Sequence, residues 1–420
     1  MVWEEPNQRS FMSDFTRRTF VGAVAGVAGL SMAKGMAEDT AAKAREIGSQ
    51  PDVVPINKEL EAQNLDSKLP PESDAGAVET FKYPFGLAHK RLHEGGWSRE
   101  VTVRELPIAK DLAGVNMHLT PGGVRELHWH KAAEWAIMLH GKARITAIDY
   151  EGKAFVSDVS QGDLWFFPEG IPHSIQGLGP DGAEFLLVFD DGTFSEFGTV
   201  PLTGWMAHTP RDIVAKNFGV PAEALAKLPP KELFIFQTAV PGSLEEDRRK
   251  AAGSLGLSPV AFDFHPMQGP ATKSTAGGEV RVVDSRTFKA STTVATAIVT
   301  LRPGGLRELH WHPNADEWMF FLEGKGRMTV FASGGRARTM DFQAEDVGYV
   351  QKTLPHYIEN TGDTDLKFLE MFKSSYFQDL SLNEWLSHVP PELVTAHLNL
   401  APATLEALPK QNNAILPVKK

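Results

Sequence analysis

A ten-residue motif occurs twice in this chain and constrains its fold more than any other feature. PGGVRELHWH begins at Pro121 and PGGLRELHWH begins at Pro303, and the two copies differ at one position. The segments 208–229 and 388–409 also match one another, so the duplication extends beyond the motif. A period of roughly 180 residues is too long for a solenoid, whose repeats span about 20–50 residues. The 420-residue chain is therefore predicted to contain two duplicated domains.

Each half contains several predicted strands and ends in predicted helices. Short segments rich in β-branched or aromatic residues are bounded by Gly, Pro or Asp; they are 143–149, 163–168 and 184–190, then 326–332, 347–351 and 366–372. Many short strands with close turn signals favour a sandwich or a closed barrel. Thr209 is expected to cap a helix that begins at Pro210 and ends at Gly219. The predicted fold is all-β, with short helical segments after each barrel.

Composition excludes several classes of function. The net charge is −11 at pH 7, so the chain lacks the basic surface that nucleic-acid-binding proteins require. The chain has no cysteine, which excludes disulfides, thiolate catalysis and zinc–thiolate sites. Any metal would therefore be held by histidine, carboxylate or water.

The first 37 residues have the order of an export signal. Arg17 and Arg18 precede an apolar stretch over 21–33, and small residues follow at Gly35 and Ala37. That stretch is shorter than the ~20 residues that span a bilayer, so stable membrane insertion is not expected. We expect residues 1–37 to be a twin-arginine signal peptide, which directs the protein to the periplasm or out of the cell. A disordered basic tail or a start codon assigned too early is the alternative.

The remaining chain divides into three predicted parts. Residues 38–79 are polar and rich in turn formers, and we expect an extended arm that gains order only by lying on another surface. The repeat then predicts one domain over 80–238 and a second over 239–420.

Four metal ligands are predicted in each half. Alternate residues of a strand share a face, so the two histidines of His-Trp-His point the same way. A nearby glutamate and a later histidine, at the same spacing from one another in both halves, complete each set. The sets are His128, His130, Glu134 and His173, and His310, His312, Glu317 and His356. Four such ligands on a six-coordinate metal leave two positions for substrate or dioxygen. Ordinary core or surface histidines are the alternative, but two complete sets favour metal.

These residues resemble a known family. The pattern G-x-R-E-L-H-W-H with a nearby Glu and a distant His is similar to the cupin metal motif, and two copies on one chain resemble the bicupin oxalate decarboxylases. The similarity runs from about residue 51 to the end and includes REVTVRELPIAKDLAGVNM, AEFLLVFDDGTFSE and HYIENTGD. The resemblance implies a duplicated cupin, which is a double β-barrel of the jelly-roll type.

The resemblance also implies an activity and its cofactors. It implies Mn²⁺, two ions per chain with one in each cupin domain, and dioxygen as a catalytic co-substrate. The substrate would be oxalate and the products formate and carbon dioxide. The protein would form a homo-oligomer, either a trimer or a hexamer, with no nucleic-acid partner.

The resemblance places the proton donor in a loop of the first half. The connection 189–205 is three residues longer than its counterpart 372–385, and an extended loop at a barrel mouth is where lids occur. Glu196 occupies the position of the family's proton donor. Without the resemblance, it would be interpreted as a solvated loop carboxylate. Arg125 and Arg307 are expected to polarise a substrate carboxylate. An ion pair with the glutamate that follows each arginine is the alternative, but adjacent strand residues face opposite sides.

The second half carries an unusual glutamate. Glu370 interrupts the apolar run LKFLEMF, where the first half has Leu187. A carboxylate that faces into a barrel is costly unless it is paired or bound to metal. We expect Glu370 near the second metal and Arg307, in a structural ion pair, with a catalytic proton-donor role as the alternative. Glu345 and Gln351 stand where the first half has Gly162 and Pro168, so the turn before His356 is expected to be altered, although the ligand remains.

Other functions stay open at this point. Phe197 and Gly198 depart from the family's loop pattern, and the glycine is expected to loosen the loop and favour oxalate oxidase chemistry. That reaction releases carbon dioxide and hydrogen peroxide. A bicupin enzyme that acts on another small acid or diketone, a seed-storage protein and a metal-binding regulator are further alternatives. The arginine beside His-x-His favours a carboxylate substrate.

Overall fold

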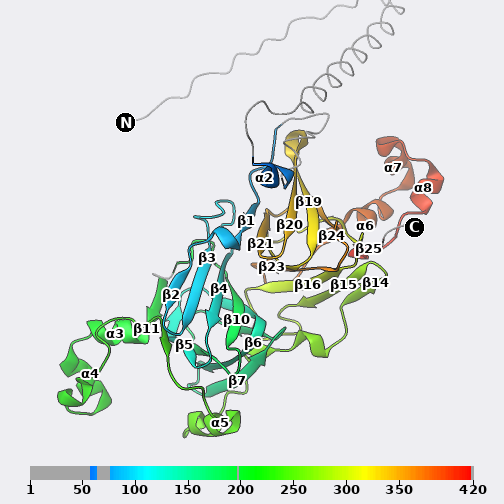
Figure 1. Ribbon diagram of the computed structural model, residues 1–420. Helices are drawn as coiled ribbons and strands as arrows, with labels where there is room; N and C mark the ends of the chain where they lie inside the picture. The colour runs from blue at the N-terminus through cyan, green and yellow to red at the C-terminus, as the bar shows by residue number, and fades with distance from the viewer. Residues whose placement is uncertain (1–56, 64–75, 196–197, 418–420) are drawn as a thin grey trace, which may run out of the picture.

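The computed structural model describes residues 57–63, 76–195 and 198–417. In these ranges two β-rich units lie beside one another, and short helices project from each of them (Figure 1). The prediction of a duplicated all-β fold with helices after each barrel is confirmed. No helix in the described ranges is long and apolar enough to cross a bilayer. The expected signal peptide over 1–37, and most of the expected arm, lie outside the described residues.

The first unit is one barrel-like antiparallel sheet. Its main path of neighbouring strands runs β11-β5-β9-β6-β10-β4-β3-β2. The strands are β2 (Arg91–His93), β3 (Gly96–Val101), β4 (Ala113–Leu119), β5 (Gly123–His130), β6 (Glu134–Ile148), β7 (Ala154–Ser160), β8 (Leu164–Phe167), β9 (His173–Gly177), β10 (Ala183–Phe189), β11 (Thr199–Pro201) and β12 (Ile235–Gln237). The long strand β6 pairs with β8 and β10 over its first half and with β7 and β9 over its second, so it joins two walls of the barrel.

The second unit divides the same strands between two sheets. One sheet contains β14 (Lys273–Thr275), β15 (Gly278–Val283), β16 (Ala295–Leu301), β18 (Glu317–Glu323), β21 (Asp346–Val350) and β23 (Leu366–Phe372). The other contains β17 (Leu306–Trp311), β19 (Lys325–Ala332), β20 (Arg336–Gln343), β22 (His356–Asn360), β24 (Leu380–Ser381) and β25 (Ile415–Leu416). The single long strand β6 of the first unit corresponds to two shorter strands here, β18 and β19.

Each barrel has its own apolar core. Trp165 and Trp318 are completely buried, and the rings of Trp165 and Phe185 lie 5.4 Å apart. In the second unit Phe321 stacks on Phe342 with ring centroids 4.5 Å apart. Complete burial of one such side chain contributes about 1.5–3 kcal/mol, so these aromatic residues anchor the strands that carry the site.

The two units exchange short strands near their boundaries. β1 (Lys82–Pro84) pairs with β21 of the second unit, and β13 (Asp263–Phe264) pairs with β8 of the first. A short helix from the expected arm, α2 (Lys58–Ala62), precedes Gln63, whose carbonyl accepts a hydrogen bond of 3.1 Å from the amide of Asp341. This part of the arm therefore lies on the second unit. The boundaries at 80 and 239 stay predictions, because strands on either side of them cross between the units.

Helices follow each barrel. The first unit has α3 (Leu202–His208), α4 (Arg211–Phe218) and the 3₁₀ turn η4 (Ala222–Leu225), and the linker holds α5 (Leu244–Ala252). The second has α6 (Leu382–Ser387), α7 (Pro391–Leu398) and α8 (Pro402–Glu406); the other 3₁₀ turns are η2 (Phe85–Leu87), η5 (Pro266–Gln268) and η6 (Ser333–Gly335). The prediction that Thr209 caps α4 is wrong. Thr209 directly follows α3 and its hydroxyl donates to the carbonyl of Trp205 within that helix, and Pro210 is the residue before α4.

The expectation of an altered turn before His356 is wrong: Thr353 has φ 69° and Gly170 has φ 74°, and their amides donate to the carbonyls of His312 and His130 at 2.9 and 3.0 Å. The earlier turn, before β21, also keeps its geometry. Glu345 has φ 69° and Gly162 has φ 86°, both in the left-handed region. Each amide donates to the equivalent carbonyl, at 2.8 Å for Glu345 and 2.9 Å for Gly162. A non-glycine residue costs roughly 1–2 kcal/mol in this conformation. An ion pair of 3.2 Å between Glu345 and Arg99 of the first unit accompanies the substitution.

Candidate metal centres

The structure brings together both predicted ligand sets. In each set, the candidate ligand atoms all lie within 4.8 Å of one another, and all eight residues are buried. His128 on β5 lies opposite His173 on β9, and His310 on β17 lies opposite His356 on β22. His130 is the last residue of β5, and His312 directly follows β17. Each glutamate is the first residue of a strand, Glu134 of β6 and Glu317 of β18. The antiparallel pairing therefore positions residues that are far apart in sequence.

The histidines are oriented for a metal ion. The Nδ1 atom of every histidine in the two sets lies 2.5–3.1 Å from a backbone carbonyl oxygen. Such a contact makes Nδ1–H the donor and leaves the Nε2 lone pair for coordination. The Nε2 atoms of His173, His310, His312 and His356, and both carboxylate oxygens of Glu317, are buried and have no hydrogen bond. His356 Nε2 lies 2.8 Å from Glu317 Oε2, but with the proton on Nδ1 both of these atoms are acceptors. Buried polar atoms are normally paired, so these unsatisfied atoms fit a bound cation.

The charge states also suit metal binding. Burial, followed by the charge of Arg125, holds the pKa of His128 well below its usual value; burial and Arg307 do the same for His310. Burial would raise the pKa of each ligating glutamate, but the surrounding histidines outweigh it and hold both pKa values below the usual range. His312 differs, since burial would lower its pKa but the adjacent Glu317 raises it. Neutral imidazoles and ionised carboxylates are the forms that bind metals, so metal binding would displace a proton held between His312 and Glu317.

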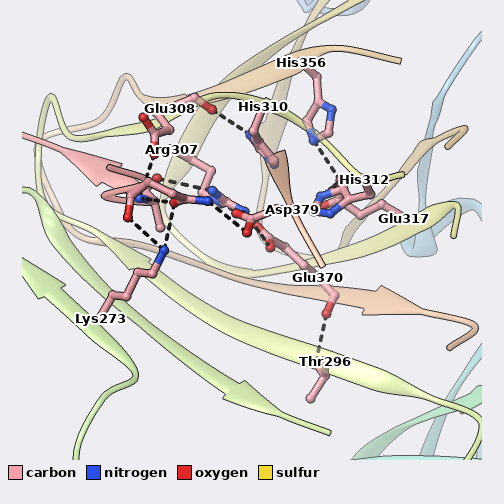
Figure 2. Close-up of polar contacts among 12 residues, drawn as sticks. Lys273, Thr296, Arg307, Glu308, His310, His312, Glu317, His356, Glu370 and Asp379 are labelled. Atoms are coloured by element: carbon pink, nitrogen blue, oxygen red, sulfur yellow. Dashed lines mark hydrogen bonds and ion pairs between the residues drawn. The ribbon is translucent and has the colours of Figure 1, made fainter. Parts of the chain in front are cut away.

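The predicted ion pair of Glu370 is present in the second unit (Figure 2). Arg307 Nε lies 2.9 Å from Glu370 Oε1, and Arg307 Nη2 lies 2.9 Å from Asp379 Oδ2. Arg307 and Glu370 have no exposed surface, and the pKa of Arg307 is raised because the two carboxylates outweigh burial. Asn412 Nδ2 donates to the second oxygen of Asp379 at 3.0 Å. Two carboxylates therefore already occupy this guanidinium.

The first unit differs at both carboxylate positions. Leu187 occupies the strand position of Glu370, since each residue lies at the same register between two equivalent strands. Thr199 occupies the position of Asp379, because it begins β11 opposite the second histidine of the motif. The Arg125 guanidinium donates from Nη1 to the carbonyl of Phe234 at 3.2 Å.

The glutamates that follow the two arginines have a separate role. Glu126 Oε1 accepts hydrogen bonds from the amides of Leu233 and Phe234, and its other oxygen accepts from Thr203. Glu308 similarly accepts from the amide of Ala414 at 2.8 Å. The alternative of an ion pair between adjacent arginine and glutamate is wrong, because these carboxylates tie the segments after each barrel to β5 and β17.

Some of the surrounding residues were not predicted. Trp165 Nε1 donates to Glu134 Oε1 at 3.0 Å and orients that ligand; the equivalent residue in the second unit is Gly348. Asp379 lies in a loop, where no periodic pattern marks it. Glu196, the predicted proton donor, lies outside the described residues.

Comparisons with known proteins agree with this architecture. A family model described as Cupin matches residues 87–225 and 266–406. Oxalate decarboxylase OxdC of Bacillus subtilis (strain 168) is 51% identical over 366 residues, which are 87% of this chain and 94% of that protein. A probable oxalate decarboxylase of Arthroderma benhamiae is 40% identical over 364 residues, 86% of this chain and 89% of that protein.

Solved structures give the same result. The structure of oxalate decarboxylase from Bacillus subtilis at pH 4.6 superposes with a TM-score of 0.84 at 50% identity, over 88% of this chain and 96% of that chain. A second structure of that enzyme, with the same TM-score and identity and covering 88% of this chain and 97% of that one, concerns its Mn(II) centers. Because the match runs through both units, this chain belongs to the cupin family, as a two-domain member of the oxalate decarboxylase group.

Proposed function

We propose that this chain is an oxalate decarboxylase that uses Mn²⁺ and dioxygen to convert oxalate to formate and carbon dioxide. Relatives named as oxalate decarboxylases cover most of the chain, and each unit has three histidines and one glutamate arranged for a metal. The observation that carries the proposal is Arg125 beside the first ligand set, at a site where leucine and threonine replace Glu370 and Asp379. This arginine is suited to bind a substrate carboxylate.

The first unit provides the groups that the reaction needs. Manganese, when bound by His128, His130, Glu134 and His173, supplies a redox-active Lewis acid for a carboxylate and for dioxygen. Arg125 presents a planar guanidinium, fixed by its bond to the backbone of Phe234, to the carboxylate group of the substrate. A charge-assisted hydrogen bond of this kind contributes about 1.5–3 kcal/mol.

The reaction consumes one proton per turnover. The carbon–carbon bond of oxalate breaks, carbon dioxide leaves, and a carbon–hydrogen bond forms on the remaining carboxylate carbon. Glu196 is the proposed donor of that proton. Phe189 and Phe194 stack at 3.6 Å, and their rings lie 5.0 and 6.2 Å from His130. These two aromatic side chains cover one side of the ligand set and keep water from it.

The second metal site is proposed to be structural. Arg307 already binds two carboxylates inside the barrel, so an oxalate carboxylate would have to displace Glu370 or Asp379. Removing one partner of a buried pair costs about 3–5 kcal/mol. A metal at this site would instead neutralise the buried Glu317 and hold β17, β18 and β22 together.

The test is an assay of purified manganese-loaded protein with oxalate at mildly acidic pH, in which formate and peroxide are measured in parallel. One formate for each oxalate consumed supports the proposal. Peroxide without formate would make the protein an oxalate oxidase, the second candidate, which the departures at Phe197 and Gly198 favour. If neither formate nor peroxide is formed, the substrate would be another small acid. A minor oxidase activity beside formate production is expected from the same loop sequence.

A homo-oligomer is part of the proposal. The helical segments α3–α4 and α6–α7 project from the two units (Figure 1). Their large apolar side chains are between 44% and 59% exposed; they are Trp205, Ile213, Phe218, Trp385, Leu393 and Leu398. Exposed apolar surface of this kind marks protein interfaces. Light scattering is expected to give a trimer or a hexamer, and a monomer would contradict this.

Export by the twin-arginine pathway is also proposed. The support is sequence alone, from Arg17 and Arg18 and the apolar stretch that follows. Replacement of both arginines with lysine should retain the protein in the cytoplasm. Cell fractionation that still finds the variant outside the cytoplasm would contradict the assignment.

A further inference from the structure

A cavity of about 400 Å³ lies beside Ser195, the residue before the proposed proton donor. It is lined by His89, Arg91, Ser98, Arg99, Glu100, Arg104, Glu105 and Ser195. Three guanidinium groups and two carboxylates line its wall, in a chain whose net charge is −11. A cation in a concave wall attracts anions, so the arginine without a carboxylate partner decides what the cavity can bind.

Arg91 differs from the other two arginines of this wall. Arg99 forms an ion pair of 3.2 Å with Glu345, and Arg104 pairs with Glu100 and lies 3.6 Å from Glu105. Within the described ranges, Arg91 forms no ion pair with a carboxylate. Its guanidinium carbon instead lies 4.2 Å from the ring centroid of Phe234. Among the three arginines of this wall, Arg91 is therefore the one whose charge no carboxylate of the described ranges neutralises directly.

The ring of Phe234 connects Arg91 to the metal site. The guanidinium carbon of Arg125 also lies 4.2 Å from this ring centroid, so the two guanidinium carbons are at most 8.4 Å apart, twice 4.2 Å. Phe234 is fixed, since its amide donates to Glu126 Oε1 at 2.6 Å. The ring of His93 lies 4.6 Å from that of Phe234, and burial together with both arginines lowers its pKa. Arg91 and Arg125 thus form two successive cationic positions from the cavity wall toward the ligands.

The second unit lacks this arrangement. Lys273 has the strand position of Arg91, but its Nζ donates to the carbonyl and side-chain oxygens of Asn412, at 2.9 and 2.8 Å. Asn412 in turn donates to Asp379, which pairs with Arg307. Ala414 replaces Phe234 and provides no aromatic face. Lys273 is thus bonded to neutral oxygens and Arg307 to two carboxylates, so the stack of two guanidinium groups on one aromatic ring is specific to the unit proposed to carry the reaction.

We propose that the cavity beside Ser195 is an anion-binding vestibule, in which Arg91 holds an entering small dicarboxylate before it reaches Arg125. The identity of the anion as oxalate rests on the proposed function; the cationic vestibule itself rests on the cavity and the Arg91–Phe234–Arg125 stack. Arg91 is a positioning residue for substrate entry and takes no part in the bond-breaking step. The vestibule accounts for how a net acidic protein captures a dianion.

The kinetic test compares three variants. Arg91→Gln removes the charge, Arg91→Lys keeps it, and Lys90→Gln removes the same charge one residue away, at a side chain over Trp97 that does not line the cavity. We expect Arg91→Gln to raise KM for oxalate about tenfold, as for the loss of one charge-assisted bond, with kcat within about twofold. The fall of kcat/KM with ionic strength should also become less steep. Arg91→Lys should recover most of the loss, and Lys90→Gln should match the unmodified protein.

Equilibrium binding separates this proposal from the proposed function. Calorimetric titration of the manganese-loaded protein without dioxygen, with sodium oxalate and with sodium malonate as a second dicarboxylate, measures binding in the absence of turnover. If no formate is produced but Arg91→Gln weakens dicarboxylate binding and Lys90→Gln does not, the proposed reaction fails and the vestibule stands. An unchanged KM and affinity in Arg91→Gln, a loss confined to kcat, or an equal effect of Lys90→Gln would overturn the vestibule. Arg91→Met, which keeps a side chain against Phe234, replaces Arg91→Gln if the latter does not fold.

Discussion

Replacing Leu187 with glutamate is expected to give Arg125 a carboxylate partner, as Glu370 is the partner of Arg307 in the second unit. Leu187 lies between β4 and β6 at the register that Glu370 has between β16 and β18. Glu370 reaches Arg307 Nε at 2.9 Å. A glutamate at 187 is therefore within reach of Arg125 and would compete with the substrate carboxylate for that guanidinium.

The expected magnitude follows from the interaction that is lost. A hydrogen bond to a charged group contributes about 1.5–3 kcal/mol, which corresponds to a fall in kcat/KM of about 10- to 150-fold. Leu187 is 3% exposed, so its replacement also removes about 1.5–3 kcal/mol of apolar burial. The new ion pair with Arg125 offsets part of that loss, and a decrease of a few degrees in Tm is expected.

Leu187→Gln is the matched control. It has nearly the shape of the glutamate variant and loses the same apolar contact, but it has no charge to occupy Arg125. The assay is steady-state formate production from oxalate, with the manganese content of each variant measured by atomic absorption. We expect Leu187→Gln to retain kcat/KM within about fivefold of the unmodified protein, since only uncharged contacts change. Equal losses in the two variants would refute the explanation, because packing and not charge would then be responsible.

Four further outcomes are expected. Trp165→Phe removes the 3.0 Å bond to Glu134 Oε1 and should weaken manganese binding in the first unit about 10- to 100-fold, as measured by competition with a chelator. Removal of both metals should lower Tm, since a ligand at 100 times its Kd stabilises by about 2.7 kcal/mol; calorimetry with and without added Mn²⁺ checks this. Burial would raise the pKa of Asp284, but hydrogen bonds from Arg286 and backbone amides lower it. Because the folded pKa lies below the unfolded one, the stabilisation is present above the unfolded pKa and is lost as pH falls through the folded pKa. Asp284→Asn should therefore destabilise at neutral pH and progressively less in acid, as measured by urea unfolding over a pH series. Glu196→Ala should reduce formate production by at least about 100-fold while both metal sites remain filled; a variant that keeps its activity would remove Glu196 as the proton donor.

The ligand sets could be predicted because two independent constraints coincide. Strand alternation puts His128 and His130 on one face, and duplication repeats the whole set at matched spacing. The ion pair between Glu370 and Arg307 was also predictable, because a carboxylate inside an apolar strand requires a partner. In both cases a strong local rule applies to a residue inside a regular strand.

Residues outside regular strands could not be found in this way. Asp379 lies in the loop before β24, and only the pairing of β24 with β17 brings it to Arg307. The exchanged strands β1 and β13 contain three and two residues, too few for a periodic pattern, so their pairing depends on distant strands. Thr209 illustrates a competing local bond, because its hydroxyl closes one helix instead of opening the next.

Selective removal of each metal site tests the central claim most directly, namely that oxalate is decarboxylated in the first unit. One variant carries His128→Ala with His130→Ala, and the other carries His310→Ala with His312→Ala. The account predicts that each binds one Mn²⁺ per chain where the unmodified protein binds two, that the first variant produces no formate, and that the second still does. Formate from the first variant, or its absence from the second at full first-site occupancy, would contradict the account.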